Sequence, residues 1–347
     1  MTDPQSRAAR DERIQAFLRR TGWEKARRAP LAGDASFRRY ERLEGAGGSA
    51  VLMDAPPPHE DARAFLAIAR HLAALGFSAP RVHADDAAAG LVLLEDLGDD
   101  TFNRVLAGPG ARAAETSLYA LAVDLLVDLH RRPAHLSIPA GLADYDSDAL
   151  LEEAMLLIEW YLPSVRETPA GADHKRAYER VWREAFASVL EGPRTLVLRD
   201  FHVDNLIRIR DRGGIAACGL VDFQDALAGH PAYDLMSLLE DARRDIDPEL
   251  AAAMRERYAC AFPDCDRAGF DTAYAVLGAG RHAKVIGIFT RLCHRDAKPG
   301  YLAHIPRVWR LLERSLAHPA LAAVKDWMDC HLPSWHRKVP PCRTAAE

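Results

Sequence analysis

Residues 198–205 of the chain read LRDFHVDN, and residues 219–226 read GLVDFQDA. Each segment places an aspartate, Asp200 or Asp222, at or just beyond a short apolar run with the composition of a buried strand. The two runs span residues 195–198 and 215–221. Asn205 follows Asp200 by five positions, and the interval before Asp222 is long enough for a β-hairpin. The sequence therefore predicts two strand ends that each carry an acidic side chain.

These polar side chains match the groups that phosphoryl transfer from ATP requires. One carboxylate orients the attacking hydroxyl and accepts its proton, while an amide oxygen and a second carboxylate hold Mg²⁺ against the triphosphate. We therefore predict Asp200 as the catalytic residue and Asn205 and Asp222 as the magnesium ligands. Taken singly, each motif is better explained as a turn or a helix cap. Both motifs in this order, with a hairpin between them, favour catalysis.

The composition predicts a soluble globular enzyme. The 347 residues are 49% hydrophobic and 27% charged, which suits more than one compact domain. The formal net charge of −5 gives no basic excess, so we expect no nucleic-acid partner. The polar N-terminal residues 1–13 lack the apolar core of a signal peptide, and Asp124 and Asp128 interrupt the apolar stretch 118–129. We expect a cytoplasmic protein without a membrane partner.

The cysteines form no C-x-x-C pair and are widely spaced, which predicts reduced thiols. The six positions are Cys218, Cys260, Cys265, Cys293, Cys330 and Cys342. A metal site at Cys330, His331 and Cys342 lacks a fourth ligand at suitable spacing.

The order of predicted elements indicates an α+β fold with two lobes, the plan of protein kinases. A hairpin is expected around residues 38–53, a helix at 60–75 and a buried strand at 91–94. Beyond residue 100 the pattern is mainly helical, with predicted helices at 113–131, 148–161, 173–190, 233–245, 248–261, 267–294, 301–316 and 319–330. We expect a nucleotide-binding lobe at 1–97 and a helical lobe at 98–347, with the ATP cleft between them.

The chain resembles the aminoglycoside phosphotransferase and choline kinase group of small-molecule kinases over about residues 10–330. The residues that carry this match are Asp200, His202, Asn205, 222–226 and 231–235. Within the group it is most similar to the anomeric N-acetylmuramate/N-acetylglucosamine kinases of bacterial cell-wall recycling. The segments that carry this narrower match are 33–40, 53–57, 198–202 and 281–289.

The resemblance implies ATP and Mg²⁺ as cofactors and an amino sugar as the small-molecule substrate, phosphorylated on its C1 hydroxyl. The product is a precursor for a downstream uridylyltransferase, with no physical contact between the two enzymes implied. The resemblance also implies the nucleotide-binding residues. Backbone amides of Gly33, Asp34, Ala35 and Ser36 would cover the phosphates, although a plain hairpin turn has the same composition. Backbone groups of Glu95 and Leu97, in the hinge 95–98, would contact adenine.

Two departures from the group's pattern concern charge. Arg199 precedes the predicted catalytic residue, where most members have other residues. Met53 occupies the strand position where a lysine usually contacts the phosphates, so Arg38 or Arg39 is expected to supply that charge. The helix acid at Glu60 or Asp61 is then expected to be solvated and without a cationic partner.

Several further residues are candidates for the substrate site. His202 could contact the substrate, but bracing of its loop is the favoured interpretation. Asp225, a second candidate for the substrate site, could instead brace its loop or contact the second metal. Asp234 is expected to anchor a loop. Arg281, Lys284 and Arg291 have spacings that place them near one helical face. This set reads either as a solvated basic stripe or as a contact for the substrate carboxylate.

Two other functions remain open at this point. An aminoglycoside or other small-alcohol kinase would need an acid-lined acceptor site, and Glu152, Glu153 and Glu159 are acids that helix surfaces carry in any case. A nucleotide-binding module without catalysis is suggested by Met53 but opposed by the presence of Asp200, Asn205 and Asp222 together. A protein kinase is disfavoured because no Ala-Pro-Glu string follows Asp222.

Overall fold

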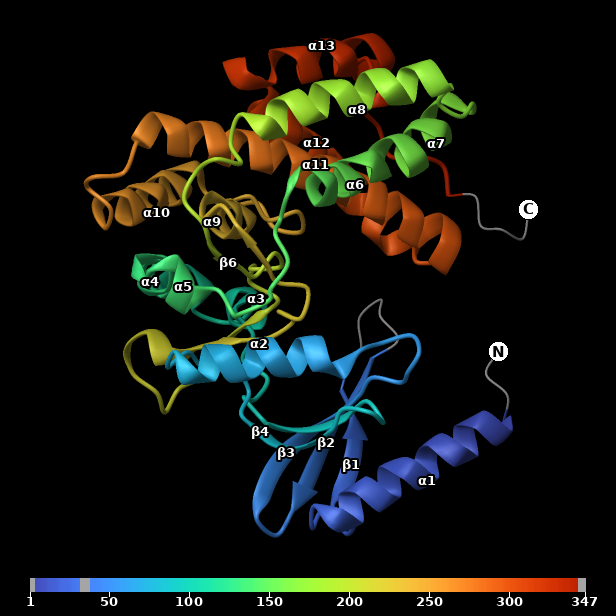
Figure 1. Cartoon of the computed structure of the whole chain (residues 1–347), viewed down its shortest axis with the longest axis vertical. Coiled ribbons are helices and arrows are strands. Elements are labelled where there is room, and N and C mark those ends of the chain that lie inside the picture. Colours follow the sequence, from blue (N-terminus) through green and yellow to red (C-terminus); the bar gives the residue numbers. More distant parts are fainter. Residues whose placement is uncertain (1–3, 32–37, 343–347) are drawn as a thin grey trace. The chain divides into compact units, whose positions relative to one another are not determined.

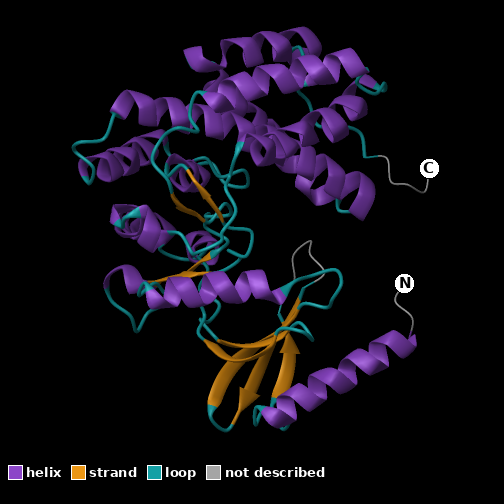
Figure 2. Cartoon of the chain, in the orientation of Figure 1, coloured by secondary structure: helices purple, strands orange, loops and turns teal. Residues whose placement is uncertain are grey.

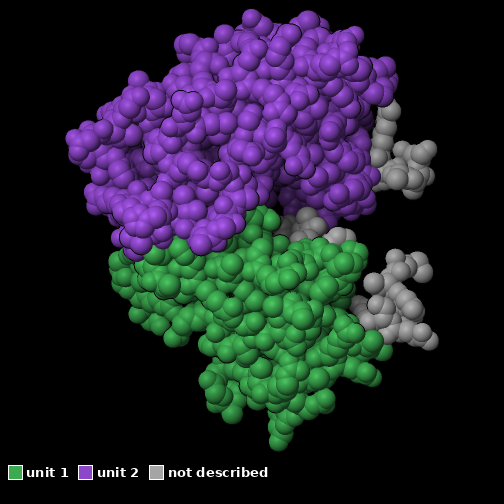
Figure 3. Space-filling model, in the orientation of Figure 1, with its two compact units in different colours: residues 1–114, 204–225 green, residues 115–203, 226–347 purple. Residues whose placement is uncertain are grey.

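A computed structural model describes residues 4–31 and 38–342. The chain forms two compact units, which Figure 3 shows in green and purple. Unit 1 comprises residues 1–114 and 204–225, and unit 2 comprises residues 115–203 and 226–347. The boundary expected after residue 97 thus lies inside unit 1. The chain also returns to unit 1 for the segment that carries Asn205 and Asp222.

Unit 1 is built on a five-stranded antiparallel sheet in the order β1-β2-β3-β5-β4 (Figure 2). Its strands are β1 (Arg27–Pro30), β2 (Arg39–Gly45), β3 (Gly48–Asp54), β4 (Val82–Asp86) and β5 (Leu91–Glu95), and its helices include α1 (Pro4–Arg20) and α2 (Ala62–Ala74). Phe17 and Leu18 of α1 pack against Leu43, Leu52 and Leu93 of the sheet, because burying these apolar side chains removes them from water. The predicted hairpin, helix and buried strand are confirmed.

A small hairpin completes unit 1. It consists of β7 (Leu206–Arg208) and β8 (Cys218–Leu220), joined through the 3₁₀ turn η2 (Gly214–Ala217), so the predicted strand 215–221 begins only at Cys218. The Leu220 amide donates to the Ser78 carbonyl at 3.0 Å, and Arg208 donates to Asp100 at 2.8 Å, near α3 (Phe102–Ala107). These backbone bonds explain why residues beyond 97 belong to this unit.

Unit 2 is mainly helical, as predicted (Figures 1 and 2). Its helical elements are α4 (Ala111–Arg131, beginning in unit 1), α5 (Ala134–Ser137), α6 (Ser147–Leu156), η1 (Leu157–Tyr161), α7 (Leu162–Arg166), α8 (Ala172–Ala187), α9 (Ala232–Leu239), α10 (Pro248–Cys260), α11 (Arg267–Asp296), η3 (Pro299–His304), α12 (Ile305–Leu316), η4 (Pro319–Leu321), α13 (Ala322–His331) and η5 (Ser334–His336). The strand β6 (Thr195–Val197) pairs antiparallel with β9 (Leu227–Gly229).

Helix α11 is the centre of unit 2 and contacts α6, η1, α9 and α12 (Figure 1). Its approach to α6 depends on Gly287, because a Cβ atom there would lie 2.3 Å from the backbone carbon of Leu156. A side chain at this position would force the two helices apart. The close packing fixes the positions of polar residues on both helices.

The described residues bear on two expectations, the absence of a membrane span and the reduced state of the cysteines. In residues 4–31 and 38–342, no helix is long and apolar enough to cross a membrane. The expectation of reduced thiols is wrong for one pair, because Cys293 of α11 forms a disulfide with Cys342. The sequence spacing of 49 residues gave no sign of this pair, which the fold of the C-terminal segment against α11 brings together.

Candidate active site

The segment that carries Asp200 is held from behind by Asp234. The carboxylate of Asp234 is fully buried and accepts hydrogen bonds from the backbone amides of Leu198, at 2.6 Å, and Arg199, at 2.9 Å. Arg199 has a φ of 67°, a strained backbone conformation that side-chain-bearing residues rarely adopt. Asp234 therefore anchors the loop, as expected. The strained residue lies directly before the predicted catalytic residue.

Two cations of α11 lie beside Asp200. The Arg281 guanidinium is 3.6 Å from the Asp200 carboxylate, and the Arg281 side chain is only 6% exposed, whereas that of Asp200 is 38% exposed. Burial opposes ionisation of Asp200, but the charges of Lys284 and Arg281 outweigh it and lower the pKa of Asp200 to about 2. Asp200 is therefore an ionised carboxylate that solvent can reach.

Glu153 of α6 joins these groups into one network. Its carboxylate accepts a hydrogen bond from the Lys284 ammonium at 2.8 Å, from the Arg199 guanidinium and from the Tyr145 hydroxyl. The Arg199 guanidinium also lies over the Tyr145 ring, 5.3 Å from its centroid. Burial opposes ionisation of Glu153, yet Lys284 and Arg199 hold its pKa below the usual value. Sequence reasoning treated Glu153 as a surface acid, and nothing in its local pattern distinguishes it from Glu152.

The predicted basic stripe on α11 divides into two parts. Arg281 is buried and the Lys284 side chain is only 12% exposed, so a solvated stripe is the wrong description for them. Burial and the neighbouring charge of Arg295 lower the pKa of Arg291, whose other charged neighbours are Asp296 and Glu159. Arg291 lies about 10 Å along the helix from Lys284 at ~1.5 Å per residue. The structure does not bring Arg291 to Asp200.

His202 lies inside the loop and is 5% exposed. Burial lowers its pKa, although the carboxylates of Asp241 and Asp200 act in the opposite direction. A neutral, buried imidazole among these charges suits bracing of the loop.

The hairpin of unit 1 brings Asn205 and Asp222 together. The amide nitrogen of Asn205 is 3.4 Å from a carboxylate oxygen of Asp222, and the Val221 amide donates to the Asn205 carbonyl at 3.1 Å. Asp222 has a φ of 61°, and the following Phe223 stacks on Phe65 of α2 with ring centroids 5.1 Å apart. A half-turn of the Asn205 side-chain amide would place its oxygen, instead of its nitrogen, beside the Asp222 carboxylate. The two atoms occupy nearly equivalent positions, so the side chain can offer either one.

This oxygen pair suits Mg²⁺, which takes one or two protein ligands and completes its shell with phosphates and water. Among residues 4–31 and 38–342, no group of three or more His, Cys, Asp or Glu side chains could hold a metal by itself. Gln224 donates to Asp222 at 2.9 Å and to Asp225 at 3.3 Å, so Asp225 is positioned to brace the pair.

Arg38 is held at the edge of the sheet by Glu60. Its guanidinium is 2.8 Å from the Glu60 carboxylate, and their side chains are 12% and 14% exposed. The expectation that the helix acid lacks a cation is therefore wrong for Glu60, because Arg38 is its ion-pair partner. Asp61 caps α2 by accepting from the Arg63 amide at 2.9 Å. Met53 is fully buried in β3 between Tyr40 and Val92.

The residues predicted for the hinge, Glu95 and Leu97, both lie inside unit 1 and make their contacts there. Glu95 pairs with Arg212 at 2.5 Å and with Arg81 at 3.2 Å, while the Leu97 side chain lies against Gly219 of β8. The predicted phosphate-covering residues Gly33, Asp34, Ala35 and Ser36 lie outside the described residues, so they stay a prediction.

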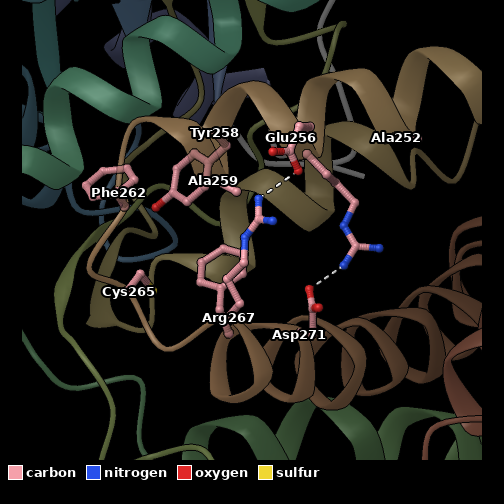
Figure 4. A pocket seen from close by; sticks show the side chains of 10 residues that line it. Ala252, Glu256, Tyr258, Ala259, Phe262, Cys265, Arg267 and Asp271 are labelled. Atoms are coloured by element: carbon pink, nitrogen blue, oxygen red, sulfur yellow. Dashed lines mark hydrogen bonds and ion pairs between the residues drawn. The ribbon is translucent and has the colours of Figure 1, made fainter.

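Two cavities of unit 2, both formed by described residues, lie apart from the candidate residues. One of about 250 Å³ opens between α10 and the start of α11 (Figure 4). Ion pairs from Arg255 to Asp271 and from Arg267 to Glu256 cross its surface, each shorter than 3 Å. A neighbouring cavity of about 640 Å³ is lined in part by His130, His230 and Phe270. Neither contains a residue predicted for catalysis or binding.

Comparison with known proteins gives a consistent result. The family model described as the phosphotransferase enzyme family matches residues 27–274. The N-acetylmuramate/N-acetylglucosamine kinase of Caulobacter vibrioides is 39% identical, covering 92% of this chain and 95% of that protein. The protein of the same name from Pseudomonas putida is 34% identical, covering 91% of this chain and 92% of its own length.

A solved ternary complex of streptomycin, ATP and APH(2″)-IIa has a similar fold, with a TM-score of 0.54. The match covers 79% of this chain and 89% of that one at 17% identity. At this identity the likeness concerns the fold alone.

Proposed function

Because the chain belongs to the phosphotransferase enzyme family, we propose that it transfers a phosphoryl group from ATP to the C1 hydroxyl of N-acetylmuramate and N-acetylglucosamine. The observation that carries this proposal is the ionised, accessible carboxylate of Asp200 beside the buried cations Arg281 and Lys284. The name shared by the relatives from Caulobacter vibrioides and Pseudomonas putida supports the choice of acceptor.

Asp200 orients the acceptor hydroxyl by accepting its hydrogen bond. With a pKa of about 2, this carboxylate is a weak base in the ground state. Phosphoryl transfer passes through a loose transition state, so the hydroxyl proton becomes acidic as the new bond to phosphorus forms. Positioning therefore contributes more than basicity, and the tight anchoring of the loop by Asp234 serves that purpose.

Asn205 and Asp222 would hold Mg²⁺, and Arg38 would supply the second cation for the triphosphate. The metal neutralises the charge of the β- and γ-phosphates when it is bound. Glu60 keeps the Arg38 guanidinium in one place, which lowers the entropy that Arg38 loses on binding phosphate. The name kinase, shared by the relatives from Caulobacter vibrioides and Pseudomonas putida, supports ATP as the donor.

The Arg281 guanidinium beside Asp200 favours an acidic acceptor over a polycationic one. It lies 3.6 Å from the Asp200 carboxylate. A guanidinium is suited to bind a carboxylate such as the lactyl group of N-acetylmuramate, whereas it repels the ammonium groups of an aminoglycoside.

The decisive experiment compares acceptors and reads the products by phosphorus NMR. We expect ATP-dependent formation of the 1-phosphates of N-acetylmuramate and N-acetylglucosamine, and no reaction with aminoglycosides or choline. The hemiacetal hydroxyl is more acidic than a primary alcohol, so it gives up its proton more easily. A methyl glycoside blocked at C1 is expected to be inert, and a 6-deoxy sugar to react. Phosphorylation of the C1-blocked sugar would overturn the assignment to C1.

A further inference from the structure

Glu153 has a role that the family resemblance does not supply. We propose that Glu153 holds the Lys284 ammonium by its 2.8 Å hydrogen bond, so that this ammonium does not compete with the acceptor hydroxyl for the Asp200 carboxylate. This inference rests on the proposed function of Asp200. In it Glu153 is a positioning residue, because it acts through Lys284 and does not contact the acceptor.

The geometry of the network supports this role. One Glu153 oxygen accepts from both Lys284, at 2.8 Å, and Arg199, and the other accepts from Tyr145. The side chains of Glu153 and Lys284 are each 12% exposed. Their helices cannot separate freely, because α11 meets the end of α6 at Gly287. Glu153 is therefore a fixed acceptor for the ammonium.

The charges show what Lys284 would do without that acceptor. Of the charged groups that lower the pKa of Asp200, Lys284 has the largest effect, ahead of Arg281 at 3.6 Å. Asp200 in turn helps to keep Lys284 protonated despite its burial. A buried ammonium without a partner is costly, so Lys284 would turn to the remaining carboxylate. A direct Lys284–Asp200 ion pair would compete with the acceptor hydroxyl for the Asp200 carboxylate.

Three variants test this proposal: Glu153→Gln, Lys284→Met and the double variant. We expect Glu153→Gln to lower kcat by about 10²-fold, the lower range for a lost base, without changing the affinity for ATP. Lys284→Met is expected to lower kcat less. In the Lys284→Met background, adding Glu153→Gln is expected to change kcat by less than about threefold, because no ammonium is left to move.

Controls separate this role from a structural one. Glu152→Gln changes the exposed neighbouring acid on α6 and is expected to leave kcat unchanged. Circular dichroism and ATP titration establish the folded fraction of each variant. A double variant as slow as Glu153→Gln, or slower than Lys284→Met by more than tenfold, would overturn the proposal. The comparison of the double variant with Lys284→Met does not use the single variant Glu153→Gln. It therefore tests the proposal even if Glu153→Gln does not fold.

The result is distinguishable from failure of the proposed function. If the wild-type protein does not phosphorylate the amino sugars, or if Asp200→Asn retains full activity, the proposed function fails. If both of those tests succeed and Glu153→Gln still slows the enzyme equally with and without Lys284, only the role of Glu153 is wrong.

Discussion

Asp200 differs from a surface aspartate in its two cationic neighbours on α11 and in the strained residue before it. Asp200→Asn preserves the shape of the side chain but removes its charge and its ability to accept a proton. We expect kcat to fall by ~10² to 10⁴ while ATP binding is kept. Steady-state rates and ATP titration of the folded variant test this expectation. Wild-type turnover by Asp200→Asn would move the catalytic role elsewhere.

Asp234 is expected to give the protein a pH dependence near neutrality. Burial raises its pKa to about 7, although the backbone bonds from Leu198 and Arg199 oppose the shift. As the pH falls through 7, the carboxyl binds a proton and can no longer accept both backbone bonds. We expect kcat to fall with the ionised fraction of Asp234, since Asp200 stays ionised. Asp234→Asn is expected to be slow and independent of pH between about 6 and 8. An unchanged acid limb in that variant would contradict this assignment.

The raised pKa of Asp234 also makes the free energy of unfolding depend on pH. The folded-state pKa lies above the ~3.9 of an unfolded aspartate, so the folded protein binds more protons between these values. The contribution of Asp234 to the free energy of unfolding is therefore greatest below pH 4 and is lost as the pH rises towards 7. Thermal unfolding of wild type and Asp234→Asn across this range measures the difference.

Asn205 and Asp222 are expected to differ in their effect on the magnesium requirement. Asp222→Ala removes the charged ligand and is expected to abolish magnesium-dependent activity. Asn205→Ala removes a neutral ligand, so it is expected to raise the magnesium concentration that half-saturates the rate. Normal magnesium titrations for both variants would place the metal site elsewhere.

At the level of elements, strand β3 has Met53 at the position expected for a phosphate-binding lysine, and we propose that Arg38, directly before β2, supplies the missing positive charge. Arg38→Met is expected to raise the KM for ATP by ~10-fold, as for a lost hydrogen bond to a charged group. Arg39→Met, at the exposed neighbouring position, is the matched control. Equal effects of both variants would rule out a specific role for Arg38.

Met53→Lys tests whether a lysine in strand β3 adds anything to the positive charge that Arg38 is proposed to supply. Met53 is fully buried in the sheet, so a lysine there places an ammonium in an apolar environment next to strands that cannot easily move. We expect a lower Tm and no gain in kcat. A large gain in activity would mean that the natural enzyme lacks a cation that Arg38 does not provide.

At the level of the whole molecule, the disulfide links α11 to the C-terminal segment across 49 residues. Cys342→Ser or a reducing agent is expected to lower the free energy of unfolding by about 2–4 kcal/mol, typical of a disulfide. The kcat should not change, because the candidate residues do not include this segment. Cys330→Ser, at an exposed free thiol, is the control. Equal melting curves with and without reductant would mean that the bond does not stabilise the fold.

The sequence by itself determined the local parts of this protein. The helices of unit 2 and the hairpins of unit 1 follow from the apolar periodicity, because each element must bury one face. The sequence also predicted that Asp200, Asn205 and Asp222 lie near strand ends. This was possible because each residue is within a few positions of its strand.

Only the tertiary structure decided which distant residues meet. Glu153 and Glu152 are indistinguishable in sequence, yet one lies among three buried partners and the other faces solvent. The pairing of Arg38 with Glu60, the burial of Arg281 and Lys284, and the Cys293–Cys342 bond have the same origin. Each depends on how helices and strands pack across tens of residues. That packing is set by the shapes of whole surfaces, to which Gly287 contributes by letting α11 approach the end of α6.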